Sequence, residues 1–373
     1  MPQISAVVPI FNGTAFLPAF FESLNAALPA GAEVILIDDG STEPVWDVIP
    51  AFPSSCNVIR LRNEMNLGYS VAVNRGFAAA TGEILVQLNT DLVLDVACIT
   101  AMVELIAHQE RVGVVGSKLV YPTTGLVQHV GMAFGDHTKI HIYKDLPAAH
   151  PLCKPTRELQ IVTGATVATT RRVLEQLGPL DEGYFNHNED LEHCLLAVKH
   201  GLRNFMCADS IAHHWESHSG PSRFAQTKTS DAIFWSRWGA SIATDLGRYI
   251  DEAIDSLLSQ RPDVEDLAFD LIDLSRGIDR AILIQRLDAR WPALEARVRH
   301  YRQLNNPIAP LSLPLLLPHW VVAEPVPFIY LVDSYRELEE NTLWFRNRAS
   351  VVEDDLIADL TGVVIHVSEL YSG

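Results

Sequence analysis

Apolar and polar positions follow two different periods over the first half of the chain. Four short apolar runs have the length and the residue types of buried strands. They span residues 4–10, 33–37, 58–61 and 84–88. Between them, apolar residues return at helical spacing, most clearly over 17–28 and in the stretch that ends near Ala80. This alternation predicts an α/β fold with a mostly parallel sheet.

Polar side chains gather at the ends of predicted strands or in the turns that follow them. Four such clusters are Asp38-Asp39, Asn89-Thr90-Asp91, Glu189-Asp190 and His213-His214. In a wound sheet, the carboxyl ends of the strands meet at one edge, and ligands bind there. We therefore expect these clusters to lie close together, although each can also be a plain polar turn or a stabilised helix end.

The residue types in these clusters suit the chemistry of a nucleoside diphosphate. Carboxylates alone would repel a diphosphate, and a divalent cation between them resolves that conflict. Asp91 offers a hard oxygen ligand, and His213 or His214 offers a nitrogen that suits Mn²⁺ better than Ca²⁺. Adjacent strand residues point in opposite directions, so only one of the two histidines can face the metal. A carboxylate away from the metal can deprotonate an alcohol.

Composition and missing motifs narrow the class of protein. The net charge of −18 argues against nucleic acid as a partner. The five cysteines are scattered and form no CxxC pair, which indicates reduced thiols in the cytoplasm. We expect neither a signal peptide nor a transmembrane helix. The first strand is not followed by a dinucleotide-binding glycine motif, and no Walker loop is present.

The pattern changes near residue 224. Helical spacing dominates to about residue 302, a proline-rich connection follows, and short strands are expected at 328–332 and 362–367. We therefore predict two domains, a sheet domain over 1–240 and an acidic, mainly α-helical region over 241–373. The sequence leaves the role of the second region open among an acceptor, a partner and a second copy of the chain.

The first 225 or so residues resemble a family 2 glycosyltransferase with the GT-A fold. The segments that carry the resemblance are residues 7–12, 37–42, 66–68, 74–76, 88–91, 163–165, 180–185 and 188–190, with His213 at the expected distance. The bacterial rhamnosyltransferase-like branch is the most similar. The resemblance implies a wound, mostly parallel sheet with helices on both faces.

The resemblance also implies a role for individual positions. Asp190 would be the general base, with Glu189 beside it, and Asp91 and His213 would bind Mn²⁺ or Mg²⁺, with His214 as the alternative ligand. The nucleotide-sugar would be bound by Pro9, Phe11, Asp38, Asp39, Asn66, Gly68, Asn74, Asn89, Thr90, Gly164 and Arg223. The implied reaction is an inverting transfer from a UDP- or dTDP-sugar to a hydroxyl of a glycan, a lipid-linked glycan or a protein. Its expected place is bacterial surface polysaccharide or glycoconjugate synthesis, in the cytoplasm or at the inner face of the membrane.

Some positions depart from the family pattern. Asn89 replaces the first Asp of the Asp-x-Asp motif, and Glu192-His193 stands where Asp-Leu is usual. Phe234 occupies the Gln position of the Gln-x-x-Arg-Trp motif, so we do not expect processive synthesis. A non-catalytic sugar-nucleotide-binding or interaction protein is therefore the alternative. A nucleotidyltransferase is disfavoured, because residues 11–14 lack its Gly-rich Arg/Lys loop.

Overall fold

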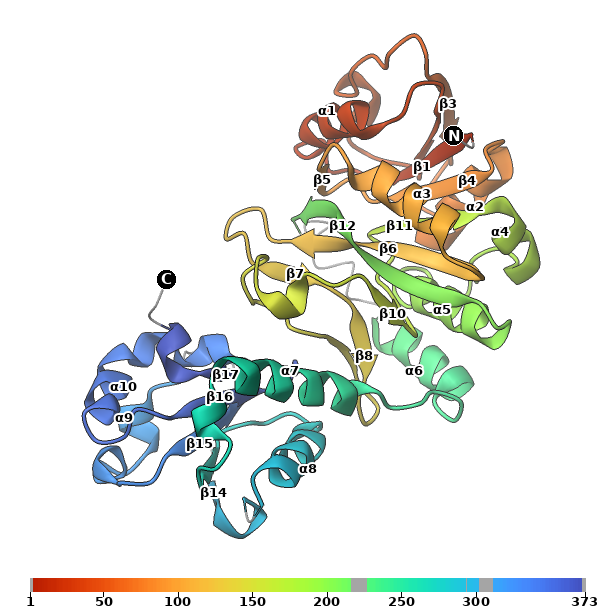
Figure 1. Ribbon diagram of the computed structural model, residues 1–373. Coiled ribbons are helices and arrows are strands. Elements are labelled where there is room, and N and C mark those ends of the chain that lie inside the picture. The colour runs from red at the N-terminus through yellow and green to blue at the C-terminus, as the bar shows by residue number, and fades with distance from the viewer. Residues whose placement is uncertain (1–2, 216–226, 293, 302–310, 371–373) are drawn as a thin grey trace. The chain divides into compact units, whose positions relative to one another are not determined.

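The computed structural model of the chain describes residues 3–215, 227–292, 294–301 and 311–370 (Figure 1). Arg223 lies outside these residues. Two compact units are present, the first formed by 1–132 with 146–242 and the second by 133–145 with 243–373. The sequence placed a boundary at 240 and gave no sign that 133–145 belongs with the second unit.

The first unit is built on a large mixed sheet whose main path runs β10-β12-β6-β11-β4-β1-β2-β3. Its strands are β1 (Ile4–Ile10), β2 (Glu33–Asp38), β3 (Asn57–Arg62), β4 (Ile84–Leu88), β6 (Val112–Val120), β10 (Arg157–Leu159), β11 (Thr166–Thr170) and β12 (Arg203–His214). Strands β1 to β4 are parallel, and β11 runs antiparallel to β4 and β6. The predicted wound, mostly parallel sheet is confirmed.

Helices cover both faces of this sheet, because successive residues of each buried strand point to opposite faces. The helices of the unit are α1 (Leu17–Ala27), α2 (Tyr69–Ala79), α3 (Cys98–His108), α4 (Arg171–Leu177), α5 (Glu189–Lys199) and α6 (Thr227–Trp238). Val8 of β1 belongs to a core that contains Phe20 of α1 and Met102 of α3. The neighbouring Val7 belongs to a second core that contains Phe77 of α2.

The weak periodicity of residues 117–160 predicts hairpins and loops. The structure has short strands in this segment, β7 (Val127–His129), β8 (Met132–Phe134) and β9 (Lys139–His141). The sequence pattern also predicts one strand over 159–169. This prediction is wrong, because two strands, β10 and β11, pair with different neighbours and the chain between them crosses the sheet. The sequence predicts two strands over 202–207 and 211–215, whereas the structure has one strand, β12, with an irregularity between Cys207 and Ile211.

The second unit combines helices with its own sheet of order β14-β13-β15-β16-β17. Its strands are β13 (Asp270–Asp273), β14 (Val298–His300), β15 (Phe328–Val332), β16 (Leu356–Asp359) and β17 (Val364–His366). Its helices are α7 (Leu246–Gln260), α8 (Arg280–Arg290), α9 (Leu313–Leu316) and α10 (Thr342–Ala349). The helices were expected, whereas β13, β14 and β16 are too short to stand out in the sequence. Within the described part of the chain, no helix is long and apolar enough to cross a membrane.

Candidate active site

Asp39 organises the loop that precedes α2. Its side chain is buried, and its carboxylate accepts hydrogen bonds from the Asn63 side chain (2.6 Å) and from the backbone N–H groups of Leu67 and Gly68 (3.0 Å each). The Asn66 side chain also accepts from the Gly68 N–H. Gly68 has a φ of +100°, and a Cβ there would lie 2.7 Å from a backbone oxygen. Asp39 therefore fixes a backbone path that only glycine follows without strain.

Asp38 is the last residue of β2, next to Asp39, and its carboxylate also has hydrogen-bond partners. It pairs with the Arg62 guanidinium and accepts a hydrogen bond from the Ser41 N–H at 2.8 Å. Pro9 is buried in the neighbouring β1, whereas Phe11, just beyond the strand, is 41% exposed. Phe11 is therefore accessible to a ligand at this edge of the sheet. The ion pair with Asp38 holds the Arg62 side chain near the same edge.

Asp91 lies beside His214 rather than His213. Strand β5 (Leu92–Leu94), which directly follows Asp91, pairs with the end of β12, so that Leu92 is opposite His214. Nε2 of the buried His214 is 3.3 Å from a carboxylate oxygen of Asp91. His213 is on the other face, with its Nε2 3.4 Å from Asp95. The preference for His213, which came from family spacing, is not supported by this geometry, and the alternative His214 takes its place beside Asp91.

The imidazole of His214 is held in one orientation by Gln128 of β7. Oε1 of Gln128 is 2.7 Å from Nδ1 of His214. Because Oε1 can only accept, Nδ1 carries the proton and Nε2 presents a lone pair. Nε2 is buried and has no hydrogen-bond partner, although it faces an Asp91 oxygen. A cation placed between these two atoms would bind both the imidazole nitrogen and the carboxylate oxygen.

This pair fits a divalent ion that is shared with a ligand. A carboxylate oxygen and an imidazole nitrogen are suitable ligands for Mn²⁺, and the Gln128 contact is the outer support that metal-binding histidines usually have. The residues described in the structure contain no group of three or more His, Cys, Asp or Glu side chains that could hold a metal. The remaining ligands would therefore come from water or from a diphosphate.

A buried hydrogen-bond chain connects Asn89 to the loop at Gly164. Nε2 of Gln87 donates to the Gly164 carbonyl and to the Tyr69 hydroxyl oxygen, both at 3.0 Å. The Tyr69 hydroxyl then donates to Oδ1 of Asn89 at 2.6 Å. A carbonyl can only accept, so the direction of every bond in the chain is fixed. Asn89 therefore has its oxygen occupied and presents its NH₂ group, which is a donor and not a metal ligand.

Three acidic residues lie close enough to Tyr69 to affect the pKa of its hydroxyl. Burial raises the pKa of Tyr69 well above its usual value, and the negative charges of Glu189, Asp190 and Asp91 raise it further. The hydroxyl therefore stays protonated, as the chain to Asn89 requires. The sequence reasoning missed Tyr69, Gln87 and Gln128. Gln87 left a signal, because it is the one polar residue in the apolar run of β4.

Asp190, in the first turn of α5, is held by backbone N–H groups. One carboxylate oxygen accepts from Gly164 at 2.6 Å, and the other accepts from Leu191 at 2.9 Å. A Cβ at Gly164 would lie 2.7 Å from the Cβ of Asp190, so glycine permits this approach. Glu189 precedes it and is buried. The backbone N–H groups of Gly164 and Leu191 thus fix the position of the Asp190 carboxylate at the start of α5.

Two other residues predicted to bind nucleotide have different surroundings. Both ends of the Asn74 side-chain amide bond the backbone of Leu180, at 2.8 and 2.9 Å. Asn74 thereby ties α2 to the loop that leads to α5. Thr90 is half-buried between Asn89 and Asp91.

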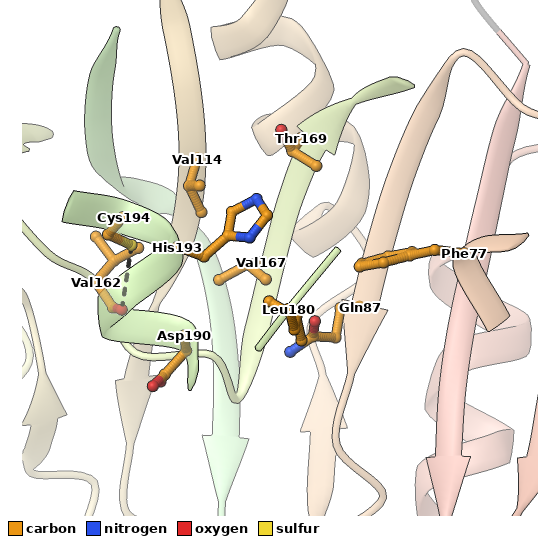
Figure 2. Close-up of a pocket in the computed structure, with 10 residues that line it drawn as sticks. All are labelled: Phe77, Gln87, Val114, Val162, Val167, Thr169, Leu180, Asp190, His193 and Cys194. Carbon is orange, nitrogen blue, oxygen red and sulfur yellow. Dashed lines mark hydrogen bonds between the residues drawn. The ribbon is translucent and has the colours of Figure 1, made fainter. Parts of the chain in front are cut away.

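A small, mainly apolar cavity lies behind Asp190, between α5 and the sheet. Figure 2 shows the His193 ring among Val114, Val167 and Thr169, with Asp190 on the same helix. His193 is 6% exposed, and its Nδ1 has no hydrogen-bond partner. Burial lowers the pKa of His193 from 6.5 to about 4. The imidazole is therefore neutral at neutral pH, and its low pKa and its burial make it a poor base for an acceptor hydroxyl.

The burial of His193 predicts a loss of stability in acid. The unfolded chain binds a proton at His193 below pH 6.5, whereas the folded chain resists protonation until about pH 4. The free energy of unfolding should thus fall by about 3 kcal/mol from this residue as the pH decreases through that window. Chemical denaturation at a series of pH values measures it, and His193→Leu should have the shallower pH dependence.

Replacement of the exposed His108 by Gln is the matched control, and it should leave the pH dependence of the wild type unchanged. Equal pH dependence in His193→Leu and the wild type would show that the buried ring does not resist protonation.

The site thus combines a wound sheet with a carboxylate at the start of a helix and an Asp–His pair at the carboxyl edge of the sheet. Residues 5–178 match the family model described as glycosyl transferase family 2. Residues 5–178 therefore carry a glycosyl transferase family 2 domain, as the resemblance noted in the sequence predicted, and this match covers slightly less than half of the chain.

Two curated relatives illustrate the extent of the similarity. The O-antigen biosynthesis protein RfbC of Myxococcus xanthus is 31% identical over 227 residues, which cover 58% of this chain and 18% of RfbC. The undecaprenyl-phosphate 4-deoxy-4-formamido-L-arabinose transferase of Serratia proteamaculans is 35% identical over 96 residues, which cover 24% of this chain and 29% of the transferase. The chain thus spans less than a third of the length of either relative.

Among solved structures, similarity is found to a mannosyltransferase from Pyrobaculum calidifontis in complex with GDP-Man and Mn²⁺. The identity is 15%, the alignment covers 65% of this chain and 66% of the other, and the TM-score is 0.47.

Proposed function

We propose that the chain is an inverting, metal-dependent glycosyltransferase that moves a sugar from a UDP- or dTDP-sugar to a hydroxyl group. One observation carries the proposal. Asp190 and Asp91 both lie near the buried Tyr69, and Asp91 is paired with His214. The Asp91–His214 pair supplies a position for a cation and a diphosphate, and Asp190 supplies a separate carboxyl group for the acceptor.

In this reaction the acceptor oxygen forms a bond to the anomeric carbon while the bond from that carbon to the phosphate oxygen breaks. Asp190 takes the proton of the acceptor hydroxyl, and the nucleoside diphosphate leaves with the electron pair. Attack from the face opposite the leaving group inverts the anomeric configuration. Asp91 and His214 would hold Mn²⁺ or Mg²⁺, and the bound ion would stabilise the negative charge of the leaving diphosphate.

The NH₂ group of Asn89 would donate a hydrogen bond to an oxygen of the donor substrate. Tyr69→Phe removes the hydroxyl that fixes the orientation of this amide. We expect the KM for the donor to rise about fivefold to tenfold, the effect of losing one hydrogen bond, with a smaller change in kcat. Steady-state kinetics at saturating acceptor measure both constants. An unchanged KM would contradict the role of the Tyr69–Asn89 contact.

The wider role rests on the relatives. Because RfbC is named for O-antigen biosynthesis, we propose that the acceptor is a glycan or a lipid-linked glycan of a bacterial surface polysaccharide. The corresponding location is the cytoplasm or the inner face of the membrane. The proposal also includes a protein as an alternative acceptor and self-association of the chain through its second unit.

Ligand-dependent thermal unfolding tests the proposal before the acceptor is known. Nucleotides that bind only the folded state raise its stability, and at 100 times Kd the gain is about 2.7 kcal/mol. UDP or dTDP with Mn²⁺ should raise the Tm more than either component alone. No shift with any nucleoside diphosphate, with or without Mn²⁺, would contradict the proposal. A shift without turnover of any donor would favour the alternative, a non-catalytic sugar-nucleotide-binding protein.

A further inference from the structure

The turn that leads into α5 has an unusual backbone. His187 and Asn188, neither of them glycine, have consecutive positive φ angles of 92° and 77°. This conformation is unfavourable for residues with a Cβ and persists only where the surroundings hold it. Asn188 is almost fully buried, and its side chain makes no capping bond to the helix that it precedes. Another part of the molecule must therefore hold the turn.

Helix α6 holds this turn through two neighbouring side chains. The Asn188 side-chain amide donates to a carboxylate oxygen of Asp231 at 2.9 Å. The Ser230 hydroxyl donates to the backbone carbonyl of Asn186 at 3.4 Å. Ser230 is buried, and so is Phe234, which is one helical turn further along the same face. The face of α6 that carries Ser230 and Phe234 thus covers the turn.

The end of α6 makes a charged contact with the first turn of α5. The Arg237 guanidinium pairs with Asp181 and lies 3.2 Å from the carboxylate of Glu192. It also lies over the Tyr184 ring, 5.6 Å from the centroid. Glu192 is 9% exposed, so removing Arg237 would leave a mostly buried carboxylate without this partner. Arg237 therefore connects α6 to the segments on both sides of the strained turn.

We propose that α6 positions the catalytic carboxylate, with Asp231 and Arg237 as the positioning residues. The inference rests on the proposed function of Asp190, and Asp190 lies two residues after Asn188. The two contacts fix where α5 starts, and hence where the Asp190 carboxylate meets the Gly164 N–H. Neither residue touches the donor or the acceptor in this account, and each acts through the placement of α5.

The Gly164 amide reports the position of Asp190 without any substrate, because its N–H donates to that carboxylate. Hydrogen exchange at Gly164 should be at least 10-fold faster in Asp231→Leu and in Arg237→Met than in the wild type. Asp231→Asn, which keeps an acceptor oxygen, and Arg237→Lys should restore most of the protection. The first two variants should also lower kcat by about 10-fold, with the KM for the donor within twofold of the wild type.

Arg203→Met is the matched control, because Arg203 also pairs with a carboxylate, Glu158, and lies over an aromatic ring, Phe205. It should leave both exchange and kcat unchanged. Wild-type exchange at Gly164 in the Asp231→Leu and Arg237→Met variants would overturn the proposal. Exchange that increases equally at Gly164 and across the sheet would also overturn it, because the role would then be general stability. Failure of the glycosyltransferase proposal would instead appear as a wild-type protein that neither binds nor turns over donors.

Discussion

Asp190→Asn is expected to reduce the rate of sugar transfer by about 10³-fold, within the range that a general base contributes. The substituted amide cannot take the proton of the acceptor hydroxyl. Donor binding should persist, because Asp190 bonds Gly164 and Leu191 and not the Asp91–His214 pair. Initial rates at saturating donor and acceptor, together with donor affinity by calorimetry, measure the two effects separately.

The asparagine can disturb the local structure, because its NH₂ group would face one of the two N–H groups that now bond the carboxylate. Asp190→Ala removes this conflict and should show the same loss of rate. Thermal unfolding of both variants checks that they are folded. Transfer activity within tenfold of the wild type in either folded variant would show that Asp190 is not the base.

His214→Ala is expected to weaken Mn²⁺-dependent binding of a nucleoside diphosphate by about 100-fold or more. Loss of a residue that only supports a metal ligand typically costs 10- to 100-fold, and a ligand itself should cost at least as much. His213→Ala should change this affinity little, since the ring of His213 faces Asp95. Titration of UDP into each variant, with Mn²⁺ and with a chelator, measures the metal-dependent part.

The two histidines serve as controls for each other, because they are adjacent on the same strand. A large loss in His213→Ala with normal binding in His214→Ala would reverse the assignment. Equal binding by both variants would show that neither histidine is a ligand.

The sequence predicted the part of the fold that repeats. The apolar runs of β1, β2 and β4 and the helical spacing of α1 were clear because each is long and regular. Short strands such as β13 and β14 were missed, because three or four residues carry little periodicity. The strands β10 and β11 were merged into one, because pairing partners far along the chain decide where a strand is interrupted.

The candidate site divides in a similar way. Residues at strand ends, such as Asp91 and Asp190, could be found because parallel strands end at a common edge. The choice between His213 and His214 depends on the register of β12 against β5, which the local sequence does not determine. The role of Gln128 could not be predicted from the sequence, because it depends on one contact with a histidine 86 residues away.

The most direct test of the account is the release of nucleoside diphosphate from a panel of UDP- and dTDP-sugars with Mn²⁺. Wild-type protein should release it from at least one donor, and release should be lost with a chelator, in Asp91→Ala and in Asp190→Asn. Only Asp190→Asn should retain the affinity of the wild type for that donor. Absence of release from every donor by the wild type, or undiminished release by both variants, would contradict the assignment of this edge as a glycosyl-transfer site.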